Sequence, residues 1–223
     1  MIYIVINNDM HIHILAMCIS KCMTYLLSFR YGMKIFMACD AESHYMCNAM
    51  VYLGKGTLEV PRTSTMGEVV VTKLVEPFFV GGRTVTTDNF FTTLPLTLSL
   101  ASHGMYLCGT IRIKPYIPKE LYNRKLQVKE SIAVFNHEHN LTLQCQQVSD
   151  KKKVLILSSC HHNPSVIEKN KTELQMFYNA TKGGVDTFDQ LKIACRFLVP
   201  LIHTLVIEGQ NHIFFHFFPI FLL

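Results

Sequence analysis

The stretch Ala180-Thr181-Lys182-Gly183-Gly184-Val185-Asp186-Thr187-Phe188-Asp189-Gln190-Leu191 decides the fold prediction for this chain. Its two carboxylates, Asp186 and Asp189, are three residues apart and therefore share one face of a helix. The glycine pair just upstream lets another backbone or a ligand approach closely. The stretch predicts an acidic helix that serves a binding or catalytic site.

Two earlier acids occur in similarly distinctive settings. Asp40 ends the apolar run 33–39, which is typical of a buried strand. Asp88 ends the β-branched run 84–87, which also predicts a strand. A two-metal phosphoryl-transfer site needs carboxylates from different elements to converge. Asp40, Asp88 and Asp186 are therefore predicted to be catalytic, and the same three acids with Asp189 are predicted to hold metal.

The predicted metal is Mg²⁺ or Mn²⁺, because magnesium prefers carboxylate and water oxygens as ligands. Two carboxylates ~4 Å apart repel by about 4 kcal/mol at an effective dielectric constant of ~20. Clustered acids thus indicate a bound cation or another function.

Each acid also has a purely structural explanation. Asp40 can start a turn with residues 41–43, and Asp88 can cap the helix that follows it. Asp186 and Asp189 can form a solvated helix face. The order of the acids, and the elements that carry them, favour the metal site over these explanations taken together.

Composition restricts the class of protein. The chain has 223 residues, enough for one large domain or two small ones, and 49% hydrophobic residues, enough for a sizeable core. Only 17% of the residues are charged, which argues against a disordered chain. The net charge of +5 fits a polyanionic partner without requiring one.

Cysteine and histidine patterns support other chemistry less well. No Cys-x-x-Cys pair is repeated, so a zinc ribbon is unsupported. Cys18 and Cys22 lie near His11 and His13 and could form half of a zinc site, whereas buried thiols are the simpler interpretation. The run 160–162, Cys-His-His, could be a metal pair or a Cys/His dyad, but a surface loop is favoured. The lysines at 151–153 are interpreted as a solvated hairpin turn, although they could contact phosphates.

The middle of the chain is predicted to be α/β. Strands are expected at 33–39, 44–53, 84–87 and 106–113, and helices at 67–75 and from 92 or 93 to 103. A basic connector beginning at Lys114 then leads to short strands at 132–135, 141–148 and 154–158. Five parts follow from this reading: a divergent apolar segment 1–27, a core 28–113, an insertion subdomain 114–172, an acidic helix 173–196 and a divergent apolar tail 197–223.

Several separated motifs, in order, resemble the piggyBac family of DNA transposases. They are Tyr31-Gly32-Met33-Lys34-Ile35-Phe36-Met37-Ala38-Cys39-Asp40, Tyr52-Leu53-Gly54-Lys55-Gly56, Thr87-Asp88-Asn89-Phe90-Phe91-Thr92-Thr93, Gly109-Thr110-Ile111-Arg112, Leu157-Ser158-Ser159-Cys160 and Tyr178–Gln190. The resemblance covers roughly residues 28–196.

The resemblance implies an RNase H-like mixed sheet flanked by helices, with a small β-rich insertion between the second and third acids. It implies that the aspartate triad falls on Asp40, Asp88 and Asp186, and that a further acid of the family falls on Asp189. It also implies metal-dependent DNA cleavage and joining at TTAA sites, transposon ends as DNA partners, a nuclear location, no membrane partner, and a homodimer as one arrangement.

The chain departs from the family pattern at both ends. Residues 1–27 and the sequence after Arg196 do not follow it, the chain has no tryptophan, and the Cys/His-rich zinc domain of many members is missing. A truncated or domesticated copy with impaired activity is therefore expected. The alternatives are a non-catalytic module that binds nucleic acid or protein, and a stand-alone RNase H-like nuclease.

Overall fold

The computed structural model describes residues 15–22, 33–54, 56–163, 166–168, 171–183 and 187. The strands are β1 (Leu15–Cys22), β2 (Met33–Asp40), β3 (Met46–Tyr52), β4 (Thr84–Thr87), β5 (Tyr106–Thr110), β6 (Ser131–Asn136), β7 (Leu141–Ser149), β8 (Lys152–Ser158), β9 (Val166–Glu168) and β10 (Lys171–Thr172). The helices are α1 (Met66–Val75), the 3-10 turn η1 (Glu76–Phe78), α2 (Leu94–Ser102), α3 (Lys119–Asn123) and α4 (Glu173–Thr181).

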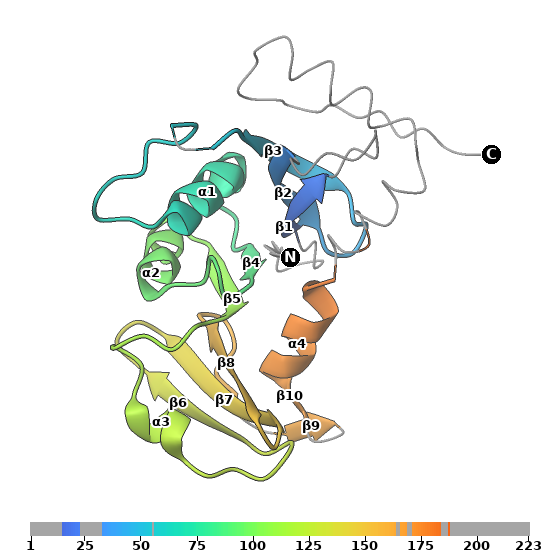
Figure 1. Cartoon of the computed structure of the whole chain (residues 1–223). Helices are drawn as coiled ribbons and strands as arrows, with labels where there is room; N and C mark the ends of the chain where they lie inside the picture. Colours follow the sequence, from blue (N-terminus) through green and yellow to red (C-terminus); the bar gives the residue numbers. More distant parts are fainter. Residues whose placement is uncertain are drawn as a thin grey trace, which may run out of the picture.

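One mixed sheet organises the fold, with the strand order β3-β2-β1-β4-β5-β8-β7-β6. β1, β2 and β3 form an antiparallel meander, while β1 runs parallel to β4, and β4 runs parallel to β5. β8 joins β5 in the antiparallel sense and continues into β7 and β6. The strands of the expected insertion thus extend the sheet of the core (Figure 1).

The helices lie on opposite faces of this sheet. Leu107 of β5 belongs to the apolar core that α1 and α2 cover, whereas its neighbour Cys108 packs with Leu174 and Tyr178 of α4. Successive side chains of a strand point to opposite faces, so α4 lies on the face that α1 and α2 leave open. Figure 1 shows α1 and α2 on one side of β4 and β5 and α4 on the other.

Capping side chains explain where α1 and α2 begin. Thr65 and Glu68 form a reciprocal capping box at the start of α1. Thr93 caps α2, and its hydroxyl also donates to Glu68 Oε1. Glu68 therefore connects the first turns of both helices, and the sequence predictions of these helices are confirmed.

Two sequence predictions differ from the structure. The segment 1–27 was predicted to be a divergent apolar segment outside the core, yet β1 lies inside it and occupies a central position in the sheet. Lys153 was placed in a solvated turn, yet its Nζ donates to the carbonyl oxygens of Tyr122 and Arg124, at 2.6 Å each. Lys153 therefore anchors the connector onto the insertion strands.

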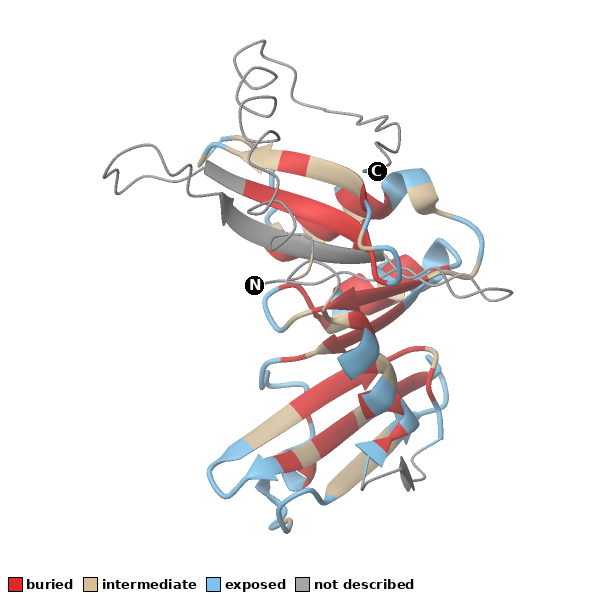
Figure 2. Ribbon diagram, turned by 90° about the vertical axis from the view of Figure 1, so that its right-hand side faces the viewer, coloured by how far each residue is buried: buried red, intermediate tan, exposed pale blue. Residues whose placement is uncertain are grey.

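Burial follows the strands. Figure 2 shows buried residues along the central parts of the strands and exposed residues at the far ends of the insertion hairpins. Among the described residues, no helix is both long enough and apolar enough to cross a membrane.

Candidate active site

Asp88 follows β4 and opens a tight turn that leads to α2. Its Oδ1 accepts the N–H of Phe90 at 2.8 Å, and its carbonyl accepts the Thr92 hydroxyl at 2.7 Å. The cap of α2 is Thr93, so Asp88 does not cap that helix. The turn fixes the direction of a half-buried carboxylate at the carboxyl end of β4.

Gly109 of β5 allows this turn to pack closely against the sheet. A Cβ atom on Gly109 would stand 2.5 Å from Thr87 Oγ1 and 2.6 Å from the Thr87 carbonyl oxygen, and closer still to Thr92 Oγ1. Thr87 and Thr92 share a hydroxyl–hydroxyl hydrogen bond of 2.6 Å directly above this position. A side chain at position 109 would therefore displace the turn that carries Asp88.

Burial raises the pKa of the Asp88 carboxyl, and the backbone N–H of Phe90 and the charge of Arg112 act in the opposite direction. Arg112 follows β5, and its Nε donates to Asn89 Oδ1 at 3.3 Å. The exposed guanidinium of Arg112 thus stands beside the half-buried Asp88 carboxylate. This is an arrangement that suits a phosphate group.

Tyr178 of α4 closes the other side of the Asp88 region. Burial raises the pKa of Tyr178 to about 12, and the charges of Cys108 and Asp88 add to this. Its hydroxyl shares a 3.3 Å hydrogen bond with Thr110 Oγ1 at the end of β5. Asp88 therefore belongs to the face of the sheet that α4 covers.

Asp40 lies on the other face. Leu15 of β1 pairs with Asp40 on one side and with Val85 on the other, so the three positions share one face. Val85 belongs to the core under α1 and α2, as do Phe36 and Ala38 of β2, which alternate in phase with Asp40.

The two acids are also offset within the sheet. Asp40 is level with Val85, three residues before Asp88, which is about 10 Å along the strand at ~3.3 Å per residue. Two strand spacings of ~4.8 Å separate them in the other direction. The structure does not bring Asp40 and Asp88 together at one site.

Asp40 instead stabilises the β2–β3 turn. Its Oδ2 accepts from the Ser43 backbone N–H at 2.7 Å and from the Ser43 hydroxyl at 2.5 Å. Its own N–H donates to the Tyr45 carbonyl at 2.8 Å. The turn role that the sequence left open for Asp40 is the one seen in the structure.

The remaining predicted acids, Asp186 and Asp189, lie outside the described residues. Within the described ranges, no three His, Cys, Asp or Glu side chains gather closely enough to hold a metal ion. β1, which separates the strands of Asp40 and Asp88, contains no acidic residue. Of the acids predicted from sequence, the structure therefore places Asp88 alone on the α4 face within its described part.

Arg112, Gly109 and Tyr178 are site residues to which sequence reasoning gave no role. Arg112 and Gly109 stand in the motif 109–112, so their presence near the predicted strand end was a usable signal. The position of Tyr178 depends on the docking of α4, for which the local sequence gives no signal.

Cys160 and His161 form a second polar cluster at the end of β8. Cys160 Sγ lies 3.1 Å from His161 Nδ1, and the Ser158 hydroxyl lies 2.9 Å from the same nitrogen. His161 is buried, and its ring lies against that of Phe177 of α4 with the centroids 4.4 Å apart, which corrects the surface-loop interpretation for this residue. Burial lowers the pKa of His161 to about 4, with a further contribution from His162.

Cys18 and Cys22 lie in β1, whereas the nearby His11 and His13 lie outside the described residues. The structure therefore leaves that pattern as a prediction.

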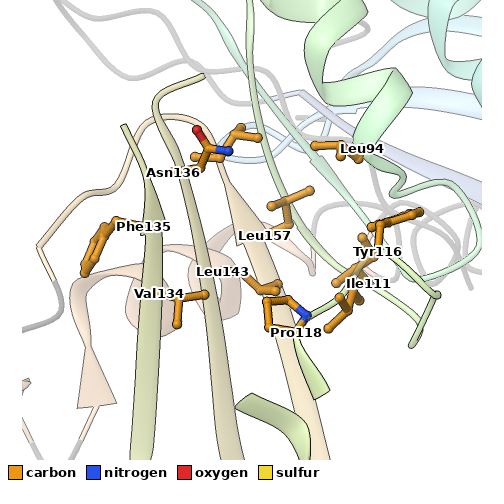
Figure 3. A pocket seen from close by; sticks show the side chains of 11 residues that line it. Leu94, Ile111, Tyr116, Pro118, Val134, Phe135, Asn136, Leu143 and Leu157 are labelled. Atoms are coloured by element: carbon orange, nitrogen blue, oxygen red, sulfur yellow. The ribbon is translucent and has the colours of Figure 1, made fainter. Parts of the chain in front are cut away.

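A pocket of about 290 Å³ lies between the start of α2, the connector and the insertion strands (Figure 3). Leu94, Ile111, Leu143 and Leu157 line it, and Asn136 is the only amide side chain among its lining residues. Without an acidic or basic lining residue, this pocket is separate from the chemistry of Asp88.

Comparison with known proteins identifies the family. The family model described as Transposase IS4 matches residues 3–203. A cryo-EM structure of a piggyBac transposase synaptic complex with hairpin DNA matches with a TM-score of 0.67 and 38% sequence identity, covering 76% of this chain and 36% of that one. The chain thus spans about a third of the length of that transposase.

The comparison confirms the expected fold, since the helix-flanked mixed sheet is consistent with an RNase H-like fold and matches the piggyBac structure. From the order of its motifs, its sheet and these two matches, the chain belongs to the IS4 transposase family and is of the piggyBac type.

Proposed function

We propose that this chain is the DNA-processing core of a piggyBac-type transposase, with metal-dependent strand cleavage and transfer at TTAA sites centred on Asp88. The observation that carries the proposal is the half-buried Asp88 carboxylate, fixed by the Phe90 N–H at 2.8 Å on the face covered by α4. Burial disfavours the charged form of this carboxylate, and a bound cation would offset that cost.

Asp88, Asp186 and Asp189 would hold Mg²⁺ or Mn²⁺, whereas Asp40 faces the opposite side of the sheet. A divalent ion bound there supplies charge stabilisation for a phosphate oxygen and lowers the pKa of an attacking hydroxyl. Arg112 would bind the phosphate next to the scissile bond, and the Phe90 N–H would hold the carboxylate in position. Tyr178 and Thr110 would keep water from the inner side of the site.

The partner under this proposal is DNA, and transposon ends with TTAA targets are the proposed substrates. The matched transposase was solved with hairpin DNA, which supports DNA as the substrate class. The chain would act in the nucleus, and two copies could process a pair of ends.

A nicking assay tests the proposal. The 223-residue chain would be incubated with labelled DNA carrying TTAA and either Mn²⁺ or EDTA. Mn²⁺-dependent nicking that Asp88→Asn abolishes and Asp40→Asn retains is the expected result. Equal nicking by wild type and Asp88→Asn would overturn the proposal.

A second candidate is a non-catalytic module that binds DNA or protein. Two observations favour it: β1 contains no acidic residue, and Asp40 points to the opposite face of the sheet. Among the described residues, Asp88 is therefore the one predicted acid on the α4 face, and no group of three metal-ligating side chains is found there. Salt-sensitive DNA binding that is independent of Mn²⁺ and unchanged in Asp88→Asn, without nicking, would support this candidate.

A further inference from the structure

Helix α4 is held on the sheet by hydrogen bonds along its length as well as by the apolar contacts of Leu174 and Tyr178. At its start, the Thr172 hydroxyl donates to Gln144 Oε1 of β7 at 2.8 Å. In its last two turns, Tyr178 contacts Thr110 at 3.3 Å, and Thr181 Oγ1 lies 3.0 Å from Thr86 Oγ1 of β4. The start, middle and end of the helix thus each bond to a different part of the sheet.

α1 is held differently. Its inner face consists of Val70, Val71, Leu74 and Val75, all buried in the main core. Apolar packing tolerates small shifts when volume is conserved, whereas a buried hydroxyl that loses its partner costs about 1–3 kcal/mol. The hydrogen bonds of α4 therefore add a directional restraint on its position along the sheet that apolar packing alone does not give.

The Thr86–Thr181 pair joins the C-terminal end of α4 to β4, the strand that leads to Asp88. Thr86 precedes Asp88 by two residues and has an exposed fraction of 0%, while Thr181 is the last residue of α4 and is 1% exposed. The Thr181 hydroxyl also donates to the Phe177 carbonyl at 2.9 Å. Neither hydroxyl has access to water as a substitute partner.

We propose that Thr86 and Thr181 are positioning residues, which fix the C-terminal end of α4 against β4 and thereby set where the chain leaves the helix relative to Asp88. The proposal rests on the proposed function, in which Asp88 shares a cation with Asp186 and Asp189. Misplacement of catalytic groups by ~1 Å can reduce the rate by about a hundredfold, so such a contact has a functional effect beyond stability.

Valine has the shape of threonine without the hydroxyl, so valine variants separate position from stability. Thr181→Val leaves the buried Thr86 hydroxyl without the Thr181 hydroxyl and destabilises the fold. Thr86→Val should cost less, because the Thr181 hydroxyl still donates to the Phe177 carbonyl. The double variant replaces both hydroxyls by methyl groups, and stability is expected to return close to that of wild type because no polar group is left unpaired. The hydrogen bond that fixes the register stays absent.

The experiment measures Mn²⁺ affinity by calorimetry and stability by urea unfolding for wild type, both single variants, the double variant and Asp88→Asn. The double variant is expected to recover stability but to bind Mn²⁺ about tenfold more weakly than wild type, as is typical when an outer contact that orients a metal site is lost. Thr97→Val is the matched control, since Thr97 is a buried threonine of α2 whose hydroxyl donates to the Thr93 carbonyl at 2.8 Å. It should lose stability and keep its Mn²⁺ affinity.

Amide hydrogen exchange supplies a readout that needs no metal. Lys182 N–H donates to the Tyr178 carbonyl at 3.0 Å, and Gln175 N–H donates to Thr172 Oγ1 at 3.3 Å. In the double variant, exchange at Lys182 should accelerate while exchange at Gln175 stays unchanged.

The outcomes separate the two proposals. Wild-type protection at Lys182 in the double variant, or recovery of Mn²⁺ affinity together with stability, would show that the pair is merely structural. Equal Mn²⁺ binding by wild type and Asp88→Asn would instead defeat the proposed function, and the exchange data alone would then decide whether the pair fixes α4.

Discussion

Asp40 and Asp88 lie on opposite faces of one sheet, although each stands at the carboxyl end of a strand that adjoins β1. The faces follow from the register, because Asp40 is level with Val85 and Asp88 lies three residues, an odd number, after Val85. Strand direction also separates the two acids. β2 runs antiparallel to β1, whereas β4 runs parallel to it, so the carboxyl ends of β2 and β4 point to opposite ends of the sheet. A carboxylate at each end cannot serve the same cation.

Replacing Asp40 should therefore affect stability and not metal binding. Asp40→Ala removes the acceptor of two Ser43 hydrogen bonds, and the free energy of unfolding should fall by about 1–3 kcal/mol. Urea unfolding with and without Mn²⁺ measures both quantities. The Mn²⁺-induced stabilisation should equal that of wild type, and its disappearance in Asp40→Ala would show that Asp40 binds the cation after all.

Gly109→Ala should be strongly destabilising. The new Cβ would meet two threonine oxygens and the Thr87 carbonyl, and overpacking in a close-packed interior costs about 1–3 kcal/mol. Thermal unfolding followed by circular dichroism measures the loss. Gly183→Ala is the matched control, because a Cβ at that position would meet nothing within 4 Å. Equal melting temperatures for both variants would contradict the packing described for the Asp88 turn.

Stability should fall in mild acid because of His161. Its pKa is lowered to about 4 from 6.5 by burial, so the unfolded chain binds the proton more readily between these values. The stabilising contribution is present in full above pH ~6.5 and is lost as the pH falls towards ~4, at about 1.4 kcal/mol for each pH unit at most. Urea unfolding between pH 7 and pH 5 should show this slope for wild type.

His161→Gln is the comparison for that measurement, because glutamine does not titrate in this range. The variant should have a flatter dependence of unfolding free energy on pH. An unchanged slope would assign the acid sensitivity to other groups.

Glu68→Ala should destabilise the starts of two helices at once. Glu68 accepts from the Thr65 N–H at 2.8 Å and also from the Thr93 hydroxyl, so its removal weakens the caps of α1 and α2. A loss of about 1–2 kcal/mol in unfolding free energy is expected, as for other helix caps. The exposed Glu59, replaced by alanine, should change it by less than about 0.5 kcal/mol.

Local sequence was sufficient to predict helices and strands that are specified by neighbouring residues. The capping threonine before residue 94 and the β-branched run at 84–87 predicted α2 and β4, because caps and strand propensity act within a few residues. The assignment of Asp40 depended on strand direction, which is set by pairing between distant segments. An apolar strand that ends in an aspartate looks the same in sequence whichever way the strand runs in the sheet.

β1 was missed for a related reason. The run Leu-Ala-Met-Cys-Ile-Ser-Lys-Cys does not alternate clearly between apolar and polar residues, since a strand in the centre of a sheet need not show that period. Its eight paired positions with β2 define it as a strand. Tyr178 and Arg112 could not be placed beside Asp88 before the packing of α4 and the end of β5 were known.

The contact between β1 and β4 has a consequence for the order of folding. Eight residue pairs join β1 to β2, but two pairs, Leu15 with Val85 and Ala16 with Thr86, join β1 to β4. The meander pairs strands that follow one another in sequence, whereas the β1–β4 contact joins residues seventy positions apart. Because loop-closure entropy opposes distant contacts, the meander should form first and the central sheet should close late. The side of the sheet that carries Asp88 is therefore completed near the end of folding.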